Sequence, residues 1–248
     1  NNHIGVPLTL LSIQQNTEIA IIEMGANHQK EIEELSNISQ PDFGYITNFG
    51  KAHLEGFGGI KGVIKGKSEL YEYLLANNRH VFLNADDSTG AYNFPNCAVA
   101  ILIGKYFNVP PIDIKSALEG YIPENNRSQI LKKNGRHIIL DAYNANPTSM
   151  QAALESFDQT KGDEKWLFLG DMFELGEDSA KEHQQIAVLS AEFGFKNVSL
   201  VGEHFTRTTT EFLQFNSFED LKNSFDFKNI TKGHILIKGS RGMAMERI

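Results

Sequence analysis

Short apolar runs and amphipathic segments alternate along the first half of the chain. The apolar runs predict strands at residues 19–23, 43–47 and 80–84, the first of them fully buried. The segments between and after these runs predict helices at residues 30–39, 59–77, 96–107 and 112–121. Strands that alternate with helices are typical of a parallel sheet, so we expect this half to form one α/β domain.

The second half repeats this pattern after a polar, proline-containing segment at residues 122–128. The dipeptide Asn134-Gly135 lies between two apolar runs and predicts a β-hairpin whose second strand ends at Asp141. Further strands are expected at residues 165–170, 197–202 and 234–239, and helices at 146–157, 179–194, 217–225 and from Ser240 onward. We therefore predict two α/β domains, residues 1–126 and residues 127–248, the second of them Rossmann-like.

Composition and charge exclude several kinds of partner. The chain has 248 residues, of which 41% are hydrophobic, and a net charge of -8 without any block dense in lysine and arginine, so nucleic acid and anionic membranes are not expected partners. No apolar run approaches the roughly 20 residues that span a bilayer, and the first residues lack the features of a signal peptide. One cysteine, Cys97, excludes an internal disulfide, and its apolar context predicts a buried thiol. We expect a cytoplasmic protein.

Two polar positions follow predicted strands in the first half. Glu23 ends the first apolar run, and because burying an unpaired carboxylate is costly, it either reaches solvent, caps the next helix or meets a cation such as a divalent metal. The second run leads into a glycine-rich stretch with Asn48, His53 and Glu55. There His53 is either a metal ligand or a solvated side chain.

Three lysines lie in the amphipathic segment that follows: Lys61, Lys65 and Lys67. Lysines on a helix usually form a solvated face, which composition alone favours here. Their spacing does not select one of them for chemistry.

Four polar residues follow the predicted hairpin: Asp141, Tyr143, Asn144 and Asn146. In an open α/β sheet, ligands bind at the carboxyl ends of the strands, so these side chains are candidates for contacting a polar ligand. The alternative is an Asx turn and a helix cap before Pro147, without any ligand.

Two later segments repeat the arrangement of a strand that runs into polar residues. They are LGDMFELGEDS at residues 169–179 and IKGSRGMAMERI at residues 237–248. In the second segment, Lys238, Ser240 and Arg241 suit a phosphate or carboxylate ligand, and a solvated surface cluster is the alternative.

Seven motifs occur in one order along almost the whole chain: IIEMGANH, TNFGKAHLEGFGG, KGKSELY, NADD, DAYNANPTSM, LGDMFELG and IKGSRGMAME. Together they resemble the Mur ligase family, and within it the MurF type, the ligases that add D-alanyl-D-alanine to UDP-N-acetylmuramoyl-tripeptide. The NANPTS and GDMFELG versions separate this resemblance from ligases that add other amino acids and from folylpolyglutamate synthase. The resemblance implies a central ATPase-like domain with a mostly parallel sheet, incomplete here, followed by a C-terminal Rossmann-like domain.

The resemblance also implies an ATP-dependent amide ligase of peptidoglycan precursor synthesis. In such enzymes ATP phosphorylates the terminal carboxylate of the precursor, and the amine of the dipeptide attacks the acyl-phosphate. Magnesium ions neutralise the phosphates, and Glu23 and His53 resemble the family's magnesium ligands. Lys67 matches the family lysine that is usually carbamylated and holds the second magnesium ion. These three residues would form the catalytic metal site.

Further contacts follow from the same resemblance. The residues implied to contact the nucleotide are Asn93, Asn96, Arg127, Asp141, Tyr143, Asn144 and Asn146. The residues implied to lie near the incoming amino-acid substrate are Lys238, Ser240 and Arg241. The asparagine-rich turn after Asp141 would then close over ATP when the two domains meet.

The sequence departs from the family pattern in several places. The glycine-rich phosphate-binding loop and the N-terminal domain that holds the UDP-sugar are absent, so we expect a polypeptide of these residues alone to be inactive as a ligase. Residues 84–94 pass abruptly from the acidic pair to the asparagine motif, which predicts a missing segment near residues 88–89. Tyr92 stands where the family commonly has histidine.

Two alternative functions stay open, and we expect a monomer in each case. The first is a related Mur or folylpolyglutamate-type ligase with another acceptor. The second is a nucleotide-binding module that keeps the fold without catalysis.

Overall fold

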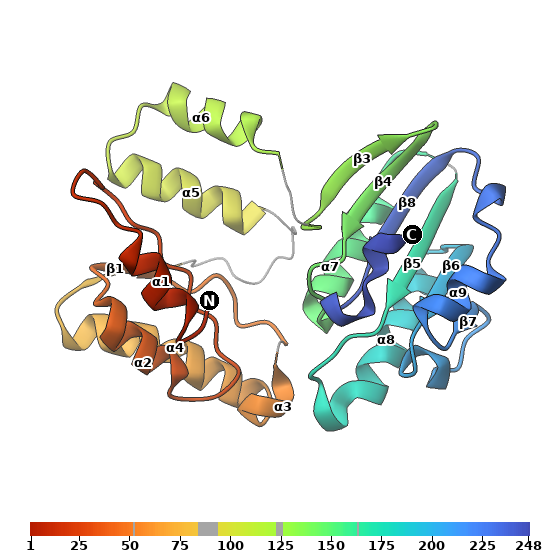
Figure 1. The fold of residues 1–248 in the computed structure, drawn as a ribbon, viewed down its shortest axis with the longest axis horizontal. Helices are drawn as coiled ribbons and strands as arrows, with labels where there is room; N and C mark the ends of the chain where they lie inside the picture. Colours follow the sequence, from red (N-terminus) through yellow and green to blue (C-terminus); the bar gives the residue numbers. More distant parts are fainter. Residues whose placement is uncertain (52, 84–93, 123–125, 163) are drawn as a thin grey trace. The chain divides into compact units, whose positions relative to one another are not determined.

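A computed structural model describes residues 1–51, 53–83, 94–122, 126–162 and 164–248 (Figure 1). The chain divides into two compact units, Asn1–Thr89 and Gly90–Ile248, here called unit 1 and unit 2. This division differs from the predicted boundary between residues 126 and 127, because the two helices that follow residue 90 are grouped with the C-terminal sheet.

Unit 1 consists of helices around a short parallel strand pair. Its helices are α1 (Gly5–Leu11), α2 (Glu31–Ser39), α3 (Leu54–Phe57) and α4 (Ile60–Ala76). Its described strands are β1 (Phe43–Tyr45) and β2 (His80–Phe82), which pair in parallel from Phe43 opposite His80 to Tyr45 opposite Phe82. The predicted helices at 30–39 and 59–77 and the strands at 43–47 and 80–84 are confirmed, with shorter strands than expected. Helix α1 was not predicted.

The prediction of a buried strand at residues 19–23 is wrong. This segment joins no described sheet, and Ile21 is 84% exposed. The neighbouring Ile22 and Met24 are half-buried and pack against the cluster of Val6, Ile32 and Leu35. The segment therefore keeps the period-2 alternation of an extended chain, but the apolar run alone could not show whether its backbone finds a strand partner.

Two glycines allow α3 to pack closely on α4. A Cβ atom at Gly62 would lie 1.8 Å from the Phe57 carbonyl oxygen, and a Cβ at Gly66 would lie 2.4 Å from the Phe57 ring. Phe57 is buried in the space that these two positions leave open. The close approach fixes the start of α4, the helix that carries Lys67.

Unit 2 is built on a six-stranded sheet. Its strands are β3 (Gln129–Lys133), β4 (Arg136–Asp141), β5 (Lys165–Gly170), β6 (Asn197–Val201), β7 (Leu213–Phe215) and β8 (Gly233–Lys238). Their order across the sheet is β3-β4-β8-β5-β6-β7, and all neighbours are parallel except the β3-β4 hairpin. Asn134 and Gly135 form the hairpin turn with positive φ angles of 50° and 75°, as the sequence predicted. The Rossmann-like α/β architecture is confirmed.

The helices of unit 2 agree with the predictions except at the end of the chain. They are α5 (Phe94–Tyr106), α6 (Pro111–Gly120), α7 (Pro147–Asp158), α8 (Ser179–Glu192) and α9 (Phe218–Ser224). The helix predicted from Ser240 onward is replaced by two 3-10 turns, Arg241–Met243 and Met245–Arg247. Ala244, between the turns, has the left-handed φ of 49°, which interrupts an α-helix.

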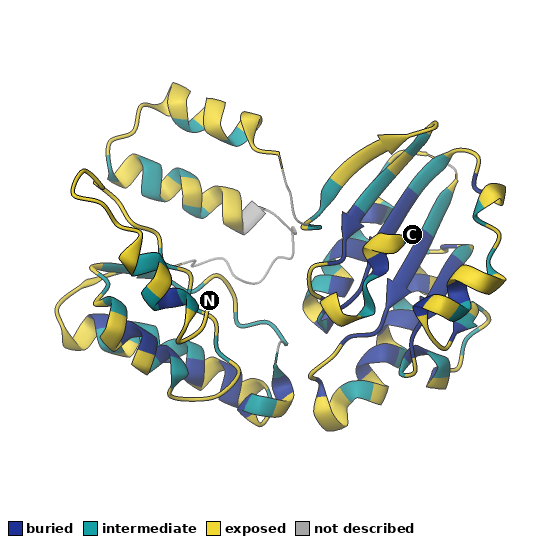
Figure 2. Cartoon of the chain, in the orientation of Figure 1, coloured by how far each residue is buried: buried dark blue, intermediate teal, exposed yellow. Residues whose placement is uncertain are grey.

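The core of unit 2 lies at its central strands. Residues of β4, β5 and β8 are buried toward their carboxyl ends, which Figure 2 shows as dark blue arrows. Parallel strands covered on both faces read as continuous apolar runs, as in LFL of β5 and ILI of β8. A polar residue at such a strand end is therefore held by a rigid, buried frame.

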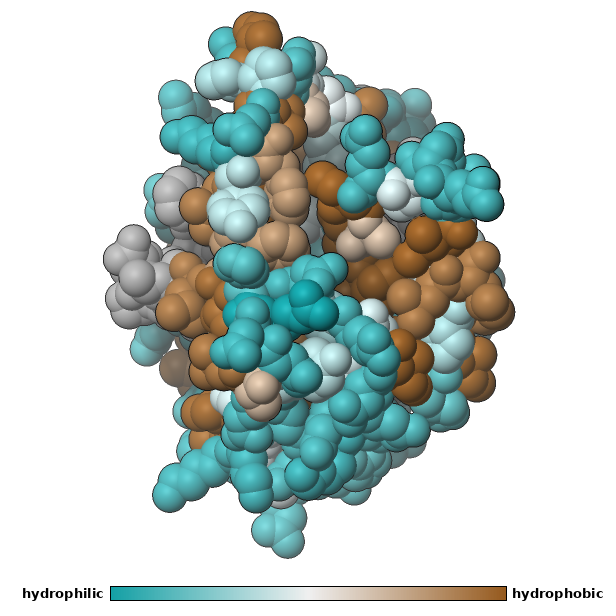
Figure 3. Space-filling model, turned by 90° about the vertical axis from the view of Figure 1, so that its left-hand side faces the viewer, coloured by the Kyte–Doolittle hydropathy of each residue, from teal (hydrophilic) through white to brown (hydrophobic). Residues whose placement is uncertain are grey.

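Several large apolar side chains remain exposed in residues 1–122. They include Leu8, Leu11, Ile21, Ile112 and Ile122, with exposed fractions from 62% to 84%. Figure 3, which faces the left-hand side of Figure 1, shows brown hydrophobic residues at the surface between teal hydrophilic ones. Cys97 is exposed as well, so the prediction of a buried thiol is wrong. No helix within the described ranges is long and apolar enough to cross a bilayer.

Glu69 of α4 caps the N-terminus of α2. Its side chain is 5% exposed, and its carboxylate accepts hydrogen bonds from the backbone N–H groups of Lys30 (2.6 Å) and Glu33 (3.1 Å). Lys30, the N-cap residue, has a left-handed backbone and does not cap the helix with its own side chain. A carboxylate near a helix N-terminus also interacts favourably with the helix dipole.

We expect Glu69→Ala to lower the free energy of unfolding of unit 1 by about 1–3 kcal/mol, because two N–H groups at the start of α2 lose a charged acceptor. Chemical denaturation and hydrogen exchange of the α2 amides measure this loss. Glu72→Ala changes an exposed carboxylate on the same helix and is the matched control. Equal protection of the α2 amides in wild type and Glu69→Ala contradicts the capping role.

Candidate active site

Lys67 differs from the other two lysines of α4 in its surroundings. Lys61 and Lys65 are exposed, whereas Lys67 is half-buried. Its Nζ donates hydrogen bonds to the backbone oxygen (2.8 Å) and the side-chain Oδ1 (3.3 Å) of Asn48, in the glycine-rich stretch singled out from the sequence. Burial lowers the pKa of Lys67, which favours the neutral amine. The structure thus distinguishes the lysine that spacing alone could not select.

The two other predicted metal ligands lie in different settings. The Glu23 side chain is 68% exposed, and its Oε2 lies 3.8 Å from the amino group of Asn1. His53 is half-buried at the N-cap of α3 and has a left-handed φ of 54°. Within the described part of the chain, no three His, Cys, Asp or Glu residues gather as a metal site. The predicted metal site of Glu23, His53 and Lys67 contains only two residues of these types, because its third ligand is a lysine. This site stays a prediction.

Two of the predicted nucleotide contacts, Asn93 and Asn96, are only partly described. Asn93 lies outside the described residues. Asn96 is exposed in the first turn of α5. Its role stays a prediction.

A buried ion pair joins the ends of β4 and β8. Asp141 and Lys238 are opposite each other in the parallel register and are 5% and 1% exposed. The Lys238 Nζ lies 2.5 Å from the Asp141 Oδ2, while Oδ1 of Asp141 accepts a hydrogen bond from the Ser128 N–H at 3.1 Å. Burial lowers the pKa of Lys238, and the Asp141 carboxylate opposes this shift.

The asparagine-rich turn is tied to this pair. Lys238 Nζ also donates to the backbone oxygen of Asn144 at 3.3 Å, and the Asn144 Oδ1 accepts from the Ala145 N–H at 2.8 Å. Asn146 forms a capping box with Ser149 at the start of α7, with hydrogen bonds of 2.9 and 3.1 Å. The helix cap, which sequence reasoning held as an alternative, is therefore confirmed for Asn146.

Ser240 links the loops that follow β4, β5 and β8. Its Oγ accepts a hydrogen bond from the Phe173 N–H at 3.0 Å and donates to the Ala145 carbonyl at 3.5 Å. Its own N–H donates to the Asp171 carbonyl at 3.1 Å. Ser240 is 4% exposed, so these hydrogen bonds join the three loops in the interior of unit 2.

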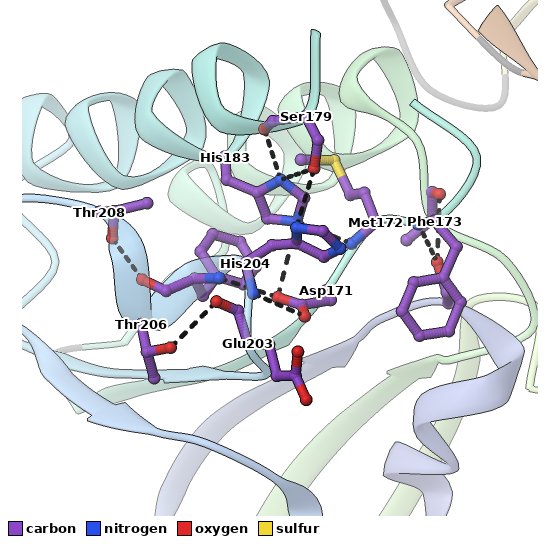
Figure 4. A network of polar contacts seen from close by, with 12 residues as sticks. Asp171, Met172, Phe173, Ser179, His183, Glu203, His204, Thr206 and Thr208 are labelled. Atoms are coloured by element: carbon purple, nitrogen blue, oxygen red, sulfur yellow. Dashed lines mark hydrogen bonds and ion pairs between the residues drawn. The ribbon is translucent and has the colours of Figure 1, made fainter. Parts of the chain in front are cut away.

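Asp171 extends these links to the loop after β6 (Figure 4). Its buried carboxylate accepts hydrogen bonds from the backbone N–H groups of His204 (3.0 Å) and Phe205 (2.9 Å). Gly202 permits this contact: its φ is 126°, and a Cβ there would lie 2.2 Å from the carboxylate. Sequence reasoning noted Asp171 only as part of a polar strand end.

His183 of α8 is fully buried beside Asp171, and sequence reasoning missed it. Its Nε2 accepts a hydrogen bond from the Met172 N–H at 3.0 Å, and its Nδ1 lies 2.7 Å from the Ser179 carbonyl. An acceptor Nε2 and a donor Nδ1 describe a neutral imidazole, so the 3.6 Å approach of Nε2 to Asp171 is not a charged ion pair. Burial lowers the pKa of His183, in agreement with the neutral ring.

Three exposed side chains gather above this buried network. The Arg127 guanidinium lies 3.9 Å from the centre of the Tyr143 ring, and the Arg241 guanidinium lies 5.6 Å from the same centre. Both distances allow cation–π contacts. Neither arginine makes an ion pair with a residue that the structure describes. Their charge is available to an anionic ligand.

Seven of the predicted site residues of unit 2 thus divide into two groups. Asp141, Asn146, Lys238 and Ser240 use their side chains to hold the loops at the carboxyl edge of the sheet. Arg127, Tyr143 and Arg241 remain exposed at that edge. The hydrogen-bonded, buried residues thus support two exposed cations and an exposed aromatic ring. Such a set of groups suits recognition of a phosphate or carboxylate.

Comparison with known proteins gives the same family for both halves of the chain. A model of the Mur ligase middle domain matches residues 1–105, and a model of the Mur ligase glutamate ligase domain matches residues 126–240. The interval between the two matches, residues 106–125, ends just before the boundary that we predicted between residues 126 and 127, and this boundary stays a prediction.

Relatives and solved structures agree with these models. The UDP-N-acetylmuramoyl-tripeptide–D-alanyl-D-alanine ligase of Bacillus subtilis is 31% identical and aligns with 100% of this chain and 67% of its own length. The Escherichia coli enzyme of the same name is 28% identical, with 100% and 68% covered. A crystal structure of MurF from Acinetobacter baumannii superposes with a TM-score of 0.85 at 28% identity, covering 100% of this chain and 67% of that one. The chain therefore spans about two thirds of the length of these relatives.

We expect Lys238→Met to destabilise unit 2 by about 3–5 kcal/mol, because it leaves the Asp141 carboxylate buried without its cation. The double variant Lys238→Met/Asp141→Leu removes both charges and should recover at least half of that loss. Urea denaturation of the three proteins measures the difference. A double variant less stable than Lys238→Met contradicts this account of the pair.

The neutral, buried His183 predicts a pH dependence of stability. Because its folded pKa is lowered, the unfolded chain binds a proton that the folded chain does not, from pH 6.5 down to the folded pKa. As the pH decreases through this window, the free energy of unfolding should fall by up to about 1.4 kcal/mol per pH unit. His183→Gln should reduce this slope, since glutamine does not titrate. Unfolding free energies of both proteins between pH 5 and 7.5 test this, and parallel curves contradict it.

Proposed function

We propose that this chain, which belongs to the Mur ligase family, carries the middle and C-terminal domains of an ATP-dependent ligase that joins D-alanyl-D-alanine to UDP-N-acetylmuramoyl-tripeptide. The observation that carries this proposal is the 31% identity to the Bacillus subtilis ligase across the whole chain. Folylpolyglutamate synthase of L. casei is 14% identical and shares the fold alone, so an acceptor of that kind is less well supported.

The proposed reaction forms one amide bond at the expense of one ATP. The terminal carboxylate of the tripeptide attacks the γ-phosphorus of ATP and releases ADP, which gives an acyl-phosphate. The amine of the dipeptide then attacks the acyl carbon, loses a proton, and expels inorganic phosphate. Such chemistry requires positive groups that stabilise the phosphoryl oxygens and a fixed position for both reactants. The product would be a precursor of peptidoglycan.

Lys67 has the properties that a carbamylated lysine requires. A neutral amine attacks CO₂ and loses a proton, so the side chain changes from a cation to a carbamate anion. Burial lowers the pKa of Lys67, and its Nζ donates hydrogen bonds to two oxygens of Asn48, while none of the described carboxylates forms an ion pair with it that would hold the ammonium form. Glu23, His53 and carbamylated Lys67 would hold Mg²⁺, which would offset the charge of the phosphates.

The exposed cluster of unit 2 supplies recognition in this proposal. Arg127 and the face of Tyr143 suit the nucleotide, and Asn96 suits its base. Arg241 suits the carboxylate of the incoming dipeptide. The buried pair of Asp141 and Lys238 would act on the reaction by keeping these groups in position. We also propose that the protein is monomeric and lies in the cytoplasm.

We expect Lys67→Ala to lower ligase activity by about 100-fold or more, because the carbamate is lost from the metal site. The assay measures phosphate release by the whole gene product with ATP, Mg²⁺ and UDP-N-acetylmuramoyl-tripeptide, with and without D-alanyl-D-alanine. Lys65→Ala changes an exposed lysine two residues away and should retain activity. His53→Ala should lose activity as Lys67→Ala does.

Depletion of CO₂ and bicarbonate adds a second readout. It should slow the wild-type enzyme reversibly and leave the residual activity of Lys67→Ala unchanged. Phosphate release that does not require the dipeptide would overturn the proposed acceptor. Equal activity of Lys67→Ala and Lys65→Ala would overturn the role of Lys67.

A further inference from the structure

We propose that Phe173 is a specificity-determining residue, and that its ring forms an apolar wall of the acceptor site in which Arg241 holds the carboxylate. The inference rests on the proposed function and names a residue that the sequence motifs did not single out. It assigns to the loop after β5 the selection of a small acceptor with apolar side chains.

Phe173 presents its ring at the carboxyl edge of the sheet. The side chain is 39% exposed, although residues 167–172 before it are all buried. The ring lies against the turn after β8, since a Cβ at Gly242 would come within 2.8 Å of the Phe173 Cε2. Gly242 leaves the space for this contact, which places the aromatic ring beside the turn that carries Arg241.

The backbone of Phe173 is held by buried polar side chains. Its N–H donates to the Ser240 Oγ at 3.0 Å, and the preceding N–H, of Met172, donates to the His183 Nε2 at 3.0 Å. Ser240 and His183 are 4% and 0% exposed. Figure 4 shows Phe173 at the end of the network away from the stacked rings of His183 and His204. A rigid aromatic ring held in this way is pre-organised for contact with a ligand.

Arg241 supplies the complementary charge. It is exposed, it makes no ion pair within the described part of the chain, and its guanidinium lies 5.6 Å from the Tyr143 ring. One cation beside two exposed aromatic rings suits a small molecule with a carboxylate and apolar substituents. D-Alanyl-D-alanine has that character, with one carboxylate and two methyl groups. A charged substituent on the acceptor would lose its hydration against the Phe173 ring.

Direct binding tests this inference without catalytic turnover. Ligand-observed NMR titration of the protein with D-alanyl-D-alanine gives Kd for wild type, Phe173→Ala, Phe173→Leu and Arg241→Ala. We expect Phe173→Ala to raise Kd about tenfold, which is the scale of a lost apolar pocket contact, and Phe173→Leu to raise it less. Phe212→Ala is the matched control, because Phe212 lines a separate groove formed with α8 and should leave Kd unchanged.

A second ligand separates this inference from the proposed function. L-Glutamate, with an additional carboxylate, should bind wild type more weakly than D-alanyl-D-alanine. Phe173→Ala should reduce the ratio of the two Kd values. If wild type binds glutamate and not the dipeptide, the proposed acceptor fails, and the effect of Phe173→Ala on glutamate binding decides the role of Phe173. Values of Kd for Phe173→Ala within twofold of Phe212→Ala overturn the inference. Absence of binding to both ligands overturns it as well.

Discussion

The buried ion pair between Asp141 and Lys238 is the interaction on which the arrangement of unit 2 depends. Either charge alone would be strongly unfavourable in this interior, so the two side chains must meet. They meet because β4 and β8 are neighbours in a parallel register that sets the two residues opposite each other. The pair also holds the backbone of Ser128 and Asn144. Strand order and the geometry of the asparagine-rich turn are therefore coupled through one contact.

From this pair a continuous set of hydrogen bonds crosses the carboxyl edge of the sheet. Ser240 joins the loops after β4, β5 and β8, and Asp171 joins the loop after β6. Each buried polar group in this set has a partner, and these hydrogen bonds hold the loops together at this edge of the sheet. The groups left at the surface are two arginines and two aromatic rings. At the same strand ends, the buried residues hold the loops in place, and the exposed residues are available to contact a ligand.

Much of this fold is predictable from the sequence, because hydrophobic period and turn residues act locally. The hairpin at Asn134-Gly135 and helix α4 are examples. The segment at residues 19–23 failed because an apolar run does not reveal a strand partner. Residue type at strand ends singled out Asp141 and Lys238 as candidates for ligand contacts, whereas their pairing with each other could be known only from the strand order. His183 was missed because the sequence around a histidine in a helix does not show that its ring accepts a hydrogen bond from a loop N–H.

Half-buried Lys67 and buried Lys238 show that the same physical effect can have two different consequences. Desolvation lowers the pKa of both Lys67 and Lys238. Lys238 meets the Asp141 carboxylate, so the charged form is compensated and the residue becomes a structural anchor. Lys67 meets the neutral oxygens of Asn48, which accept its protons as hydrogen bonds but do not compensate its charge. Burial thus favours the neutral amine of Lys67, and the neutral amine is the form of lysine that reacts with CO₂.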